Sequence, residues 1–151
     1  MGLQTKHEKT AKYIRRGYNL KIYEKAVKDL KLCGINHIIT HVILGLPGES
    51  KEMMYDTIDY VCKSGVDGIK LQLLHILKDT ALAIQYEKQP FHIMELNEYC
   101  ELIAKCLQIV PASIIVHRLT GDGPKNLLIA PKWSANKKTV LNTLSKYIES
   151  Y

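Results

Sequence analysis

The sequence lacks the features that mark membrane-spanning, secreted and disordered proteins. Among its 151 residues, no apolar run approaches the roughly 18–20 residues that a membrane-spanning helix needs, which excludes a transmembrane helix. The first ten residues, MGLQTKHEKT, contain no apolar segment of the kind found in secretory signals. Apolar residues make up 46% of the chain and charged residues 24%, which is the balance of a globular domain. We therefore expect a cytoplasmic globular protein.

Paired cysteine motifs are also absent. The four cysteines are Cys33, Cys62, Cys100 and Cys106, and no two of them are spaced as C-x-x-C. This spacing excludes zinc fingers and thioredoxin-type redox motifs. Without a secretory signal, we expect the thiols to be reduced. The last three cysteines fall within helical patterns and are expected to be buried, since a free cysteine usually behaves as a small hydrophobic residue.

Acidic residues are fewer than basic ones. The 15 Asp and Glu residues and 21 Lys and Arg residues give a formal charge of +6 and a pI of about 9.1. Such a charge suggests nucleic acid as a partner, but the basic residues are dispersed along the chain. The densest groups are Lys132, Lys137 and Lys138, and Lys12, Arg15 and Arg16. Solvated helix faces explain this distribution better than an RNA-binding surface does.

Helical and strand-like patterns alternate along the chain. Helices are predicted over residues 20–33, 50–64, 96–109 and 136–151, and strands over residues 35–44, 68–77, 113–119 and 126–130. The first two strands are apolar along nearly their whole length, which is typical of parallel strands covered on both faces. The alternation predicts an α/β fold of βα units around a parallel sheet. The pattern changes near residue 90, where we place a domain boundary.

A glycine-rich turn follows the strand predicted over residues 35–44. Gly45 and Gly48 would let a ligand approach the backbone closely, because no Cβ stands in the way. The turn lies at the carboxyl end of a parallel strand, where α/β folds place their sites, and the amides of the next helix suit a polar or anionic ligand. A tight strand-to-helix turn, with Glu49 in the first helical turn, explains the same residues equally well.

Polar residues interrupt the strand predicted over residues 68–77. Strand alternation places Lys70 and Gln72 on one face and His75 on the other. A buried lysine needs a partner or a wet pocket, so this face predicts a polar cavity. His75 is equally explained as a satisfied histidine at the rim of the core. Further along, Arg118 and Asp122 either pair with each other or position a charged ligand.

Six stretches occur in an order that resembles one family of enzymes. They are GLQT at 2–5, RRGY at 15–18, HVILGLPGE at 41–49, GIKL at 68–71, HRLTGD at 117–122 and APKW at 130–133. Together they resemble the radical S-adenosylmethionine (radical SAM) superfamily, and they cover essentially the whole chain. The resemblance is to a bacterial branch related to the elongator catalytic subunit, whose members are described as Fe–S oxidoreductases or coproporphyrinogen-oxidase-like proteins.

This resemblance implies the C-terminal part of a partial (β/α)6 TIM-like barrel over residues 1–90, followed by a family-specific α/β extension over residues 91–151. In the family, a Cys-x-x-x-Cys-x-x-Cys loop binds a 4Fe–4S cluster, and S-adenosylmethionine on its open iron is cleaved to a 5′-deoxyadenosyl radical. This chain lacks the cysteine triplet and the first three strands. We therefore expect part of a longer enzyme, inactive alone, with no cofactor bound to this chain and no metal ligands in it.

The resemblance also implies half of a site for S-adenosylmethionine. Gln4 corresponds to a polar residue that contacts the ribose or the methionine. Arg16, or its neighbour Arg15, corresponds to an arginine that pairs with the methionyl carboxylate. His41 occupies a position where relatives often have a residue that binds the ribose.

The remaining implied contacts lie further along the chain. Residues 43–49 correspond to the motif that supports the adenine, and His75 would lie near the adenine edge. Lys70 and Gln72 would face the substrate. The cofactor-binding residues that the resemblance implies are Gln4, Arg16, His41, Ile43, Gly45, Leu46, Pro47, Gly48, Glu49 and His75.

Two alternatives to a fragment of a radical enzyme stay open. One is a non-catalytic α/β module that binds a small molecule, and the other is an RNA-binding domain, suggested by the charge and by the tRNA-directed chemistry of the elongator relative. The substrate of the full-length enzyme would accordingly be a small molecule or a tRNA. Without its preceding strands, the strand over residues 35–44 would expose an apolar edge, which predicts a homodimer through that edge and no membrane contact.

Overall fold

A four-stranded parallel sheet forms the centre of the computed structural model, which describes residues 1–150. Its strands are β1 (Gly2–Gln4), β2 (Ile39–Leu44), β3 (Gly68–Leu73) and β5 (Ile115–Arg118). They lie in the order β1-β2-β3-β5, and each neighbouring pair is parallel. This arrangement confirms the predicted α/β fold class and agrees with part of a TIM-like barrel.

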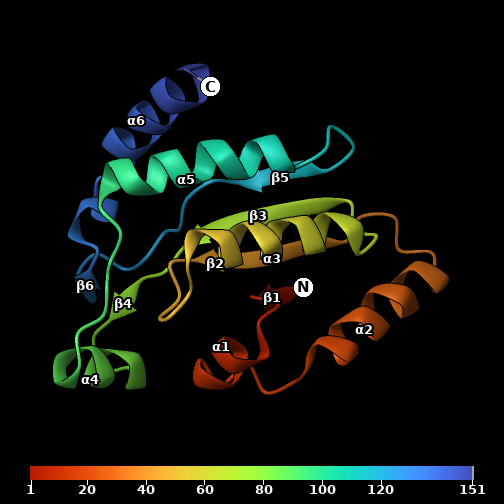
Figure 1. The fold of residues 1–151 in the computed structure, drawn as a ribbon, viewed down its shortest axis with the longest axis horizontal. Helices are drawn as coiled ribbons and strands as arrows, with labels where there is room; N and C mark the ends of the chain where they lie inside the picture. The colour runs from red at the N-terminus through yellow and green to blue at the C-terminus, as the bar shows by residue number, and fades with distance from the viewer. Residues whose placement is uncertain (151) are drawn as a thin grey trace.

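Helices connect the strands and extend the chain beyond them (Figure 1). They are α1 (Glu8–Tyr13), α2 (Leu20–Leu32), α3 (Lys51–Lys63), α4 (Ala81–Lys88), α5 (Leu96–Ile109), the 3-10 helix η1 (Lys132–Ala135) and α6 (Lys137–Ser150). The four predicted helices are confirmed as α2, α3, α5 and α6, and α5 has the predicted limits. None of these helices is both long and apolar enough to cross a membrane.

Local capping explains where two of these helices begin. The Asn19 side chain accepts a hydrogen bond from the Ile22 amide at 3.1 Å, and the Ser50 hydroxyl accepts one from the Met53 amide at 3.3 Å. Each bond satisfies one of the amides that the first turn of a helix leaves without a partner. Both capping residues therefore fix where a helix starts relative to the strand beside it.

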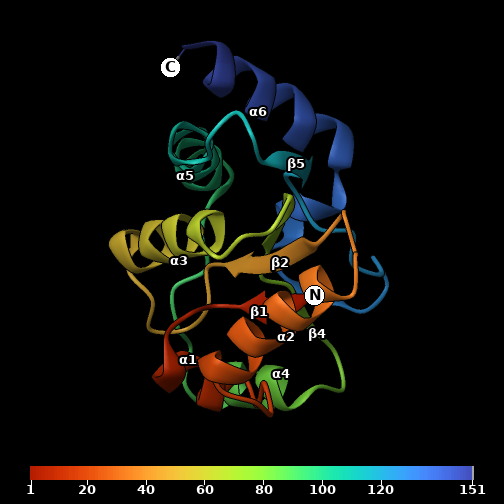
Figure 2. The same ribbon diagram turned by 90° about the vertical axis from the view of Figure 1, so that its right-hand side faces the viewer.

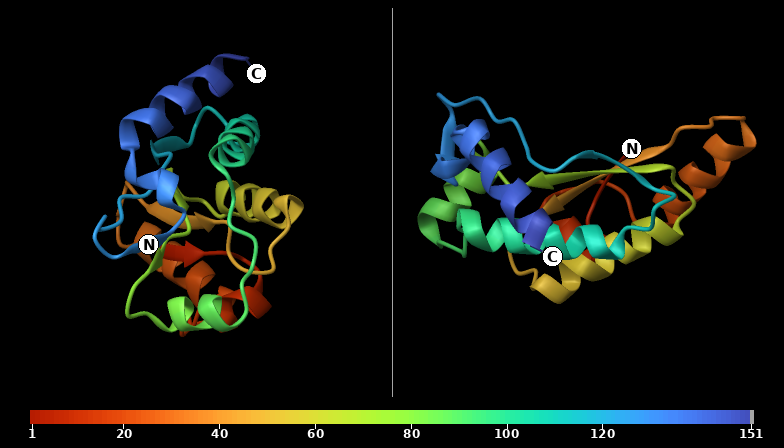
Figure 3. Two further views of the ribbon diagram at one scale, coloured as in Figure 1. Left: turned by 90° about the vertical axis from the view of Figure 1, so that its left-hand side faces the viewer. Right: turned by 90° about the horizontal axis from the view of Figure 1, so that it is seen from above.

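Three of the connecting helices cover the same face of the sheet. Val42 and Leu44 of β2 and Leu71 of β3 point toward these helices and are at most 1% exposed. The Tyr23 hydroxyl of α2 hydrogen-bonds with the Thr40 hydroxyl of β2 at 2.8 Å on this face. Helices α3 and α5 lie side by side on the same side of the strands (Figure 3, right). The main core therefore lies between the sheet and α2, α3 and α5.

The alternate residues of the strands form the opposite face, which we call the open face. It comprises Gln4 of β1, Ile39, His41 and Ile43 of β2, and Lys70 and Gln72 of β3, all of them half-buried. The register places His41 beside Lys70, and Ile43 beside Gln72. This confirms that Lys70 and Gln72 share one face, and it sets polar side chains where a complete barrel has its interior.

The strand predicted over residues 68–77 is in fact two strands. β3 ends at Leu73, and β4 (Ile76–Leu77) pairs antiparallel with β6 (Leu128–Ala130) in a separate two-stranded sheet (Figure 1). The strand alternation therefore stops before His75, and the prediction that His75 and Gln72 face opposite sides is wrong. A Cβ built on Gly121 would lie 2.7 Å from His75 Cε1 and 3.1 Å from Gln72 Cγ, so both side chains approach the same glycine.

The strand predicted over residues 35–44 also needs correction. It begins only at Ile39, and it is not an edge strand, because β1 pairs with it on one side and β3 on the other. The edge position is taken by β1, which Figure 2 shows beside β2. A three-residue edge strand offers few unpaired backbone groups to another chain. The structure therefore does not support the reason for which a homodimer was expected, namely an exposed apolar edge at residues 35–44.

Candidate functional site

The loops that follow β1, β2 and β3 form what we call the carboxyl edge of the sheet, made of residues 5–7, 45–50 and 74–75. All three strands run in the same direction, so these loops leave the sheet on one side. This edge is where α/β proteins assemble sites from separate segments of the chain. It contains most of the predicted cofactor-binding residues.

The turn after β2 has the backbone that its glycines permit. Gly45 and Gly48 have φ angles of 84° and 81°, which other residues adopt only with strain. A Cβ on Gly45 would also lie 2.7 Å from Met94 Cε, whereas a Cβ on Gly48 would meet nothing within 4 Å. Residues 45–51 line a cavity of about 260 Å³ together with Phe91, His92 and Met94. The turn is therefore both a tight connection and one wall of a small cavity.

Glu49 ties the loop after β2 to the loop after β1. Its Oε1 accepts a hydrogen bond from the Thr5 hydroxyl at 2.5 Å, and the same hydroxyl accepts one from the His7 amide at 3.1 Å. Burial raises the pKa of the Glu49 carboxyl, and hydrogen bonds from Thr5 and Thr10 oppose that rise. The carboxylate therefore fixes the relative positions of two loops at the carboxyl edge.

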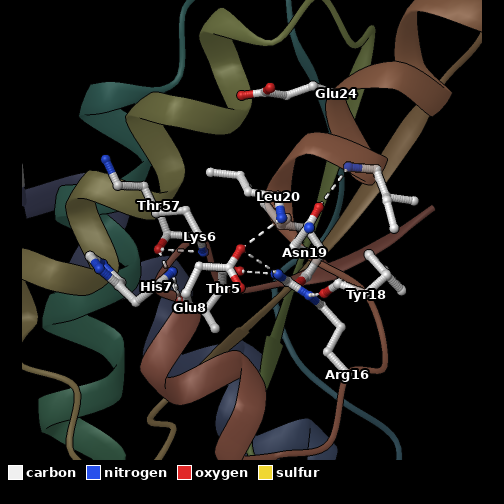
Figure 4. A network of polar contacts seen from close by, with 12 residues as sticks. Thr5, Lys6, His7, Glu8, Arg16, Tyr18, Asn19, Leu20, Glu24 and Thr57 are labelled. Atoms are coloured by element: carbon white, nitrogen blue, oxygen red, sulfur yellow. Dashed lines mark hydrogen bonds and ion pairs between the residues drawn. The ribbon is translucent and has the colours of Figure 1, made fainter.

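Arg16 organises the same region from beneath the surface (Figure 4). Its side chain is 1% exposed, and its guanidinium donates to the Leu3 and Thr5 carbonyls at 3.2 and 2.7 Å. It also donates to the Tyr18 carbonyl at 2.8 Å and to Glu8 Oε1 at 3.1 Å. The structure therefore places Arg16 in an internal network rather than on the open face, and its pairing with a methionyl carboxylate stays a prediction.

Glu8 extends this network to the next helix. The carboxylate that receives Arg16 also accepts a hydrogen bond from the Leu20 amide at 2.6 Å, at the start of α2. Arg15, the alternative to Arg16, has a left-handed φ of 57° and is exposed. The end of β1 and the start of α2 are thus held together through one buried guanidinium.

Gln4 and His41 lie on the open face. The Gln4 side chain folds back over Gly2, so closely that a Cβ on Gly2 would collide with its amide nitrogen. His41 lies in register beside Lys70. Burial lowers the pKa of His41, and the nearby charges of Lys70, the Met1 amine and Arg118 lower it further. His41 is therefore a neutral imidazole near pH 7, able to donate and accept a hydrogen bond at once.

His75 carries an unsatisfied nitrogen at the carboxyl end of β3. Its Nε2 is buried and has no hydrogen-bond partner within residues 1–150. A Cβ on Gly123 would lie 3.1 Å from His75 Nδ1, so glycines at 121 and 123 let this loop close over the ring. Burial lowers the pKa of His75, and Asp122 partly opposes that shift. Burying a polar atom without a hydrogen-bond partner costs free energy, so this position fits a polar ligand that forms a hydrogen bond with Nε2.

The cysteines do not form a metal site in the part of the chain that the structure describes. Cys33 is exposed at the end of α2, Cys62 lies on α3, and Cys100 and Cys106 are buried on α5. Burial raises the pKa of Cys100 to about 11 and that of Cys106 to about 12, which keeps both as neutral thiols. No group of three or more potential ligands occurs among residues 1–150. These residues therefore do not fit an iron–sulfur cluster.

Several contacts around the site were not predicted from the sequence patterns. Trp133 donates to the Met94 carbonyl at 2.9 Å and packs on Tyr99, which fixes the segment facing Gly45. Asp122 pairs with Lys137 at 2.9 Å, so the expected pair with Arg118 does not form. These contacts join distant segments, and a local sequence pattern carries no signal for them.

Comparison with known proteins agrees with this architecture. The model of the Radical SAM superfamily matches residues 1–61, and the model of the Radical_SAM C-terminal domain matches residues 66–150. The chain is 43% identical to YtqA of Bacillus subtilis over 150 residues, which are 99% of this chain and 46% of YtqA. It is 32% identical to YhcC of Escherichia coli over 151 residues, all of this chain and 48% of YhcC. The chain thus spans about half the length of these relatives.

A solved structure with the same fold is archaeal Elp3 of Methanocaldococcus infernus with an N-terminal deletion. The TM-score is 0.84 at 21% identity, over 99% of this chain and 35% of that one. The similarity covers the parallel sheet together with the segments that extend it. With both family models matched in succession along one parallel α/β sheet, this chain belongs to the radical SAM superfamily.

Proposed function

We propose that this chain is the C-terminal half of a radical SAM Fe–S oxidoreductase, that it supplies part of the S-adenosylmethionine site, and that it does not catalyse alone. The observation that carries the proposal is the carboxyl edge: three strand-end loops meet there, while the four cysteines lie dispersed on helices. The relatives, about twice as long, have room for a cluster-binding segment. In such an enzyme, S-adenosylmethionine bound to the cluster supplies the 5′-deoxyadenosyl radical.

Each part of the carboxyl edge has a distinct role in this proposal. The turn over residues 45–49 supports the adenine together with Ile43, which lies on the open face just before the turn. His75 Nε2, which has no hydrogen-bond partner within residues 1–150, would form a hydrogen bond with a polar group of the cofactor. Gln4 and His41 contact the ribose or the methionine. Residues 91–151 act as an extension that holds Met94 against the turn through Trp133.

The protein is proposed to work in the cytoplasm, with a small molecule or a tRNA as the substrate of the full-length enzyme. Lys70 and Gln72, which share the open face with His41, would contact that substrate. The alternative is a non-catalytic α/β module that binds a small molecule or RNA. If it binds RNA, its affinity would fall steeply with salt, because binding would release counterions from several phosphates.

An NMR titration of the chain with S-adenosylmethionine tests this proposal. We expect weak binding, since half of the contacts come from elsewhere, with amide shifts confined to residues 43–49 and 74–75. Amides of residues 25–32 in α2 serve as an internal control, because that end of the helix leads into the start of β2, at the opposite end of the strand from the carboxyl edge. Shifts centred on another region, or none at millimolar ligand, would contradict the proposed site.

A further inference from the structure

One row of basic side chains crosses the sheet without a matching row of acids. The register sets His41 of β2 beside Lys70 of β3, and Lys70 beside Arg118 of β5. We call these three residues the basic row. Adjacent strands lie about 4.8 Å apart, so the row spans roughly 10 Å across three strands. Like charges placed directly opposite each other on neighbouring strands destabilise a sheet. A group of negative charge beside the row would offset this repulsion.

A local irregularity brings Arg118 into this row. The register between β3 and β5 shifts after Ile69, so that Lys70 pairs with Arg118 instead of His117. His117 lies over Gly68, where a Cβ would come within 2.8 Å of its ring. Bulges of this kind redirect side chains, and they are common beside functional sites. The shift therefore sets a guanidinium at the level of the lysine.

The surrounding protein does not neutralise the row. The ten ion pairs found among residues 1–150 include neither Lys70 nor Arg118. Asp122 acts on Arg118 through space, but its carboxylate is already bound to Lys137 at 2.9 Å. Both Lys70 and His41 are half-buried, which strengthens any charge interaction that they make. The half-buried Lys70 and the exposed Arg118 thus lie side by side in register, and no ion pair found within residues 1–150 joins either of them to a carboxylate.

We propose that the basic row binds an anionic group, a phosphate or a carboxylate, on the substrate. Lys70 and Arg118 would contact the anion directly, and His41, on the neighbouring strand, would lie close enough to sense its charge. The position is the middle of the strands, below the carboxyl edge at which we place S-adenosylmethionine. Calling the anion a substrate group rests on the proposed function, whereas anion binding itself does not.

The test uses the chain alone, with inorganic pyrophosphate and malonate as probes at constant ionic strength set with sodium chloride. The readout is the pKa of the His41 imidazole, followed by NMR. The charged groups that face His41 are Lys70 from β3, Arg118 from β5 and the Met1 amine from β1. All three are cationic, so a bound anion must raise the pKa of His41.

Lys70→Gln removes the central charge of the row and is expected to weaken binding about ten-fold, as expected for a charge-assisted hydrogen bond. Lys28→Gln is the matched control, since Lys28 is exposed on α2, which covers the other face of the sheet, and we expect a change of less than about two-fold. Lys70→Arg keeps the charge and should retain binding. Circular dichroism of each variant confirms that the fold is kept.

The outcomes separate the possible anions. Tighter binding of pyrophosphate identifies a phosphate site, and tighter binding of malonate identifies a carboxylate site. An unchanged His41 pKa with both probes, or equal binding by the wild type and Lys70→Gln, overturns the proposal. Anion binding without any response to S-adenosylmethionine would instead count against the proposed function alone.

Discussion

The carboxyl edge and the open face differ in how their polar groups are satisfied. At the edge, Glu49 is bonded to Thr5, and the Arg16 guanidinium makes four hydrogen bonds, three to backbone carbonyls and one to Glu8. On the open face, Lys70 has no ion pair among residues 1–150. His75 Nε2 is an exception at the edge, because it lacks a hydrogen-bond partner within the same residues. The edge is therefore preorganised by internal bonds, whereas the open face presents groups for a ligand. The comparison separates residues that build a site from residues that contact its occupant.

The largest expected effect comes from breaking the network at the edge. Arg16→Met removes the buried guanidinium that donates to the Leu3 and Thr5 carbonyls and to the Glu8 carboxylate, and we expect it to reduce the free energy of unfolding by about 3 kcal/mol. Urea denaturation measures this loss. The neighbouring exposed residue supplies the control: Arg15→Met should change stability by less than about 0.5 kcal/mol. Equal losses in the two variants would show that the network does not organise the edge.

The two glycines of the turn after β2 provide a second, smaller comparison. Gly48→Ala meets only backbone strain and should cost about 1 kcal/mol, while Gly45→Ala must also displace the flexible end of Met94 and should cost slightly more, by less than about 1 kcal/mol. Thermal or urea unfolding of both variants checks the difference. Adding Met94→Ala should remove the extra cost of Gly45→Ala, and a failure to do so would refute the close contact.

The histidines make stability depend on pH. Because His41 and His75 have a lowered pKa in the folded state, the unfolded chain takes up protons first as the pH falls. The free energy of unfolding should therefore decrease as the pH falls below the usual histidine pKa of about 6.5. His75→Gln should flatten this dependence between about pH 7.5 and 5.5. A slope unchanged by His75→Gln would mean that this imidazole is not buried in the neutral form.

Replacing Glu49 should change stability least, and the contribution of Glu49 should depend on pH in the opposite direction to that of the histidines. Its raised pKa means that the folded state favours the protonated carboxyl, so the charged form weakens stability as the pH rises above the unfolded value of about 4.5. Glu49→Gln keeps an acceptor for Thr5 and should leave stability at pH 7 equal or slightly higher, within about 1 kcal/mol. A marked loss of stability would show that the charge itself holds the two loops together.

The main helices and strands were predictable because their signals are local. Asn19 and Ser50 mark helix starts through their own side chains, and the apolar spacing of residues 96–109 gives α5 its limits. α1 and α4 were missed, since they bury few residues and so show little periodicity. The break between β3 and β4 was hidden because the apolar run continues through it.

The candidate site was predictable only in part, for a related reason. The glycine turn at residues 45–48 identifies itself by residue type and place. The internal role of Arg16 depends on the chain returning beneath β1, and the approach of Met94 to Gly45 depends on Trp133 about forty residues away. No local sequence pattern encodes contacts between residues that lie so far apart in the chain. The orphaned nitrogen of His75 likewise follows from the loop at Gly121 and Gly123, which only the folded chain brings near.

The most direct test of the account is anaerobic reconstitution of this chain with iron and sulfide, followed by reduction in the presence of S-adenosylmethionine. Among residues 1–150 the cysteines lie apart, and those on α5 have a raised thiol pKa, so we predict iron well below one cluster per chain and no 5′-deoxyadenosine. A stoichiometric 4Fe–4S cluster that cleaves S-adenosylmethionine would contradict the proposal that this chain supplies only part of the site.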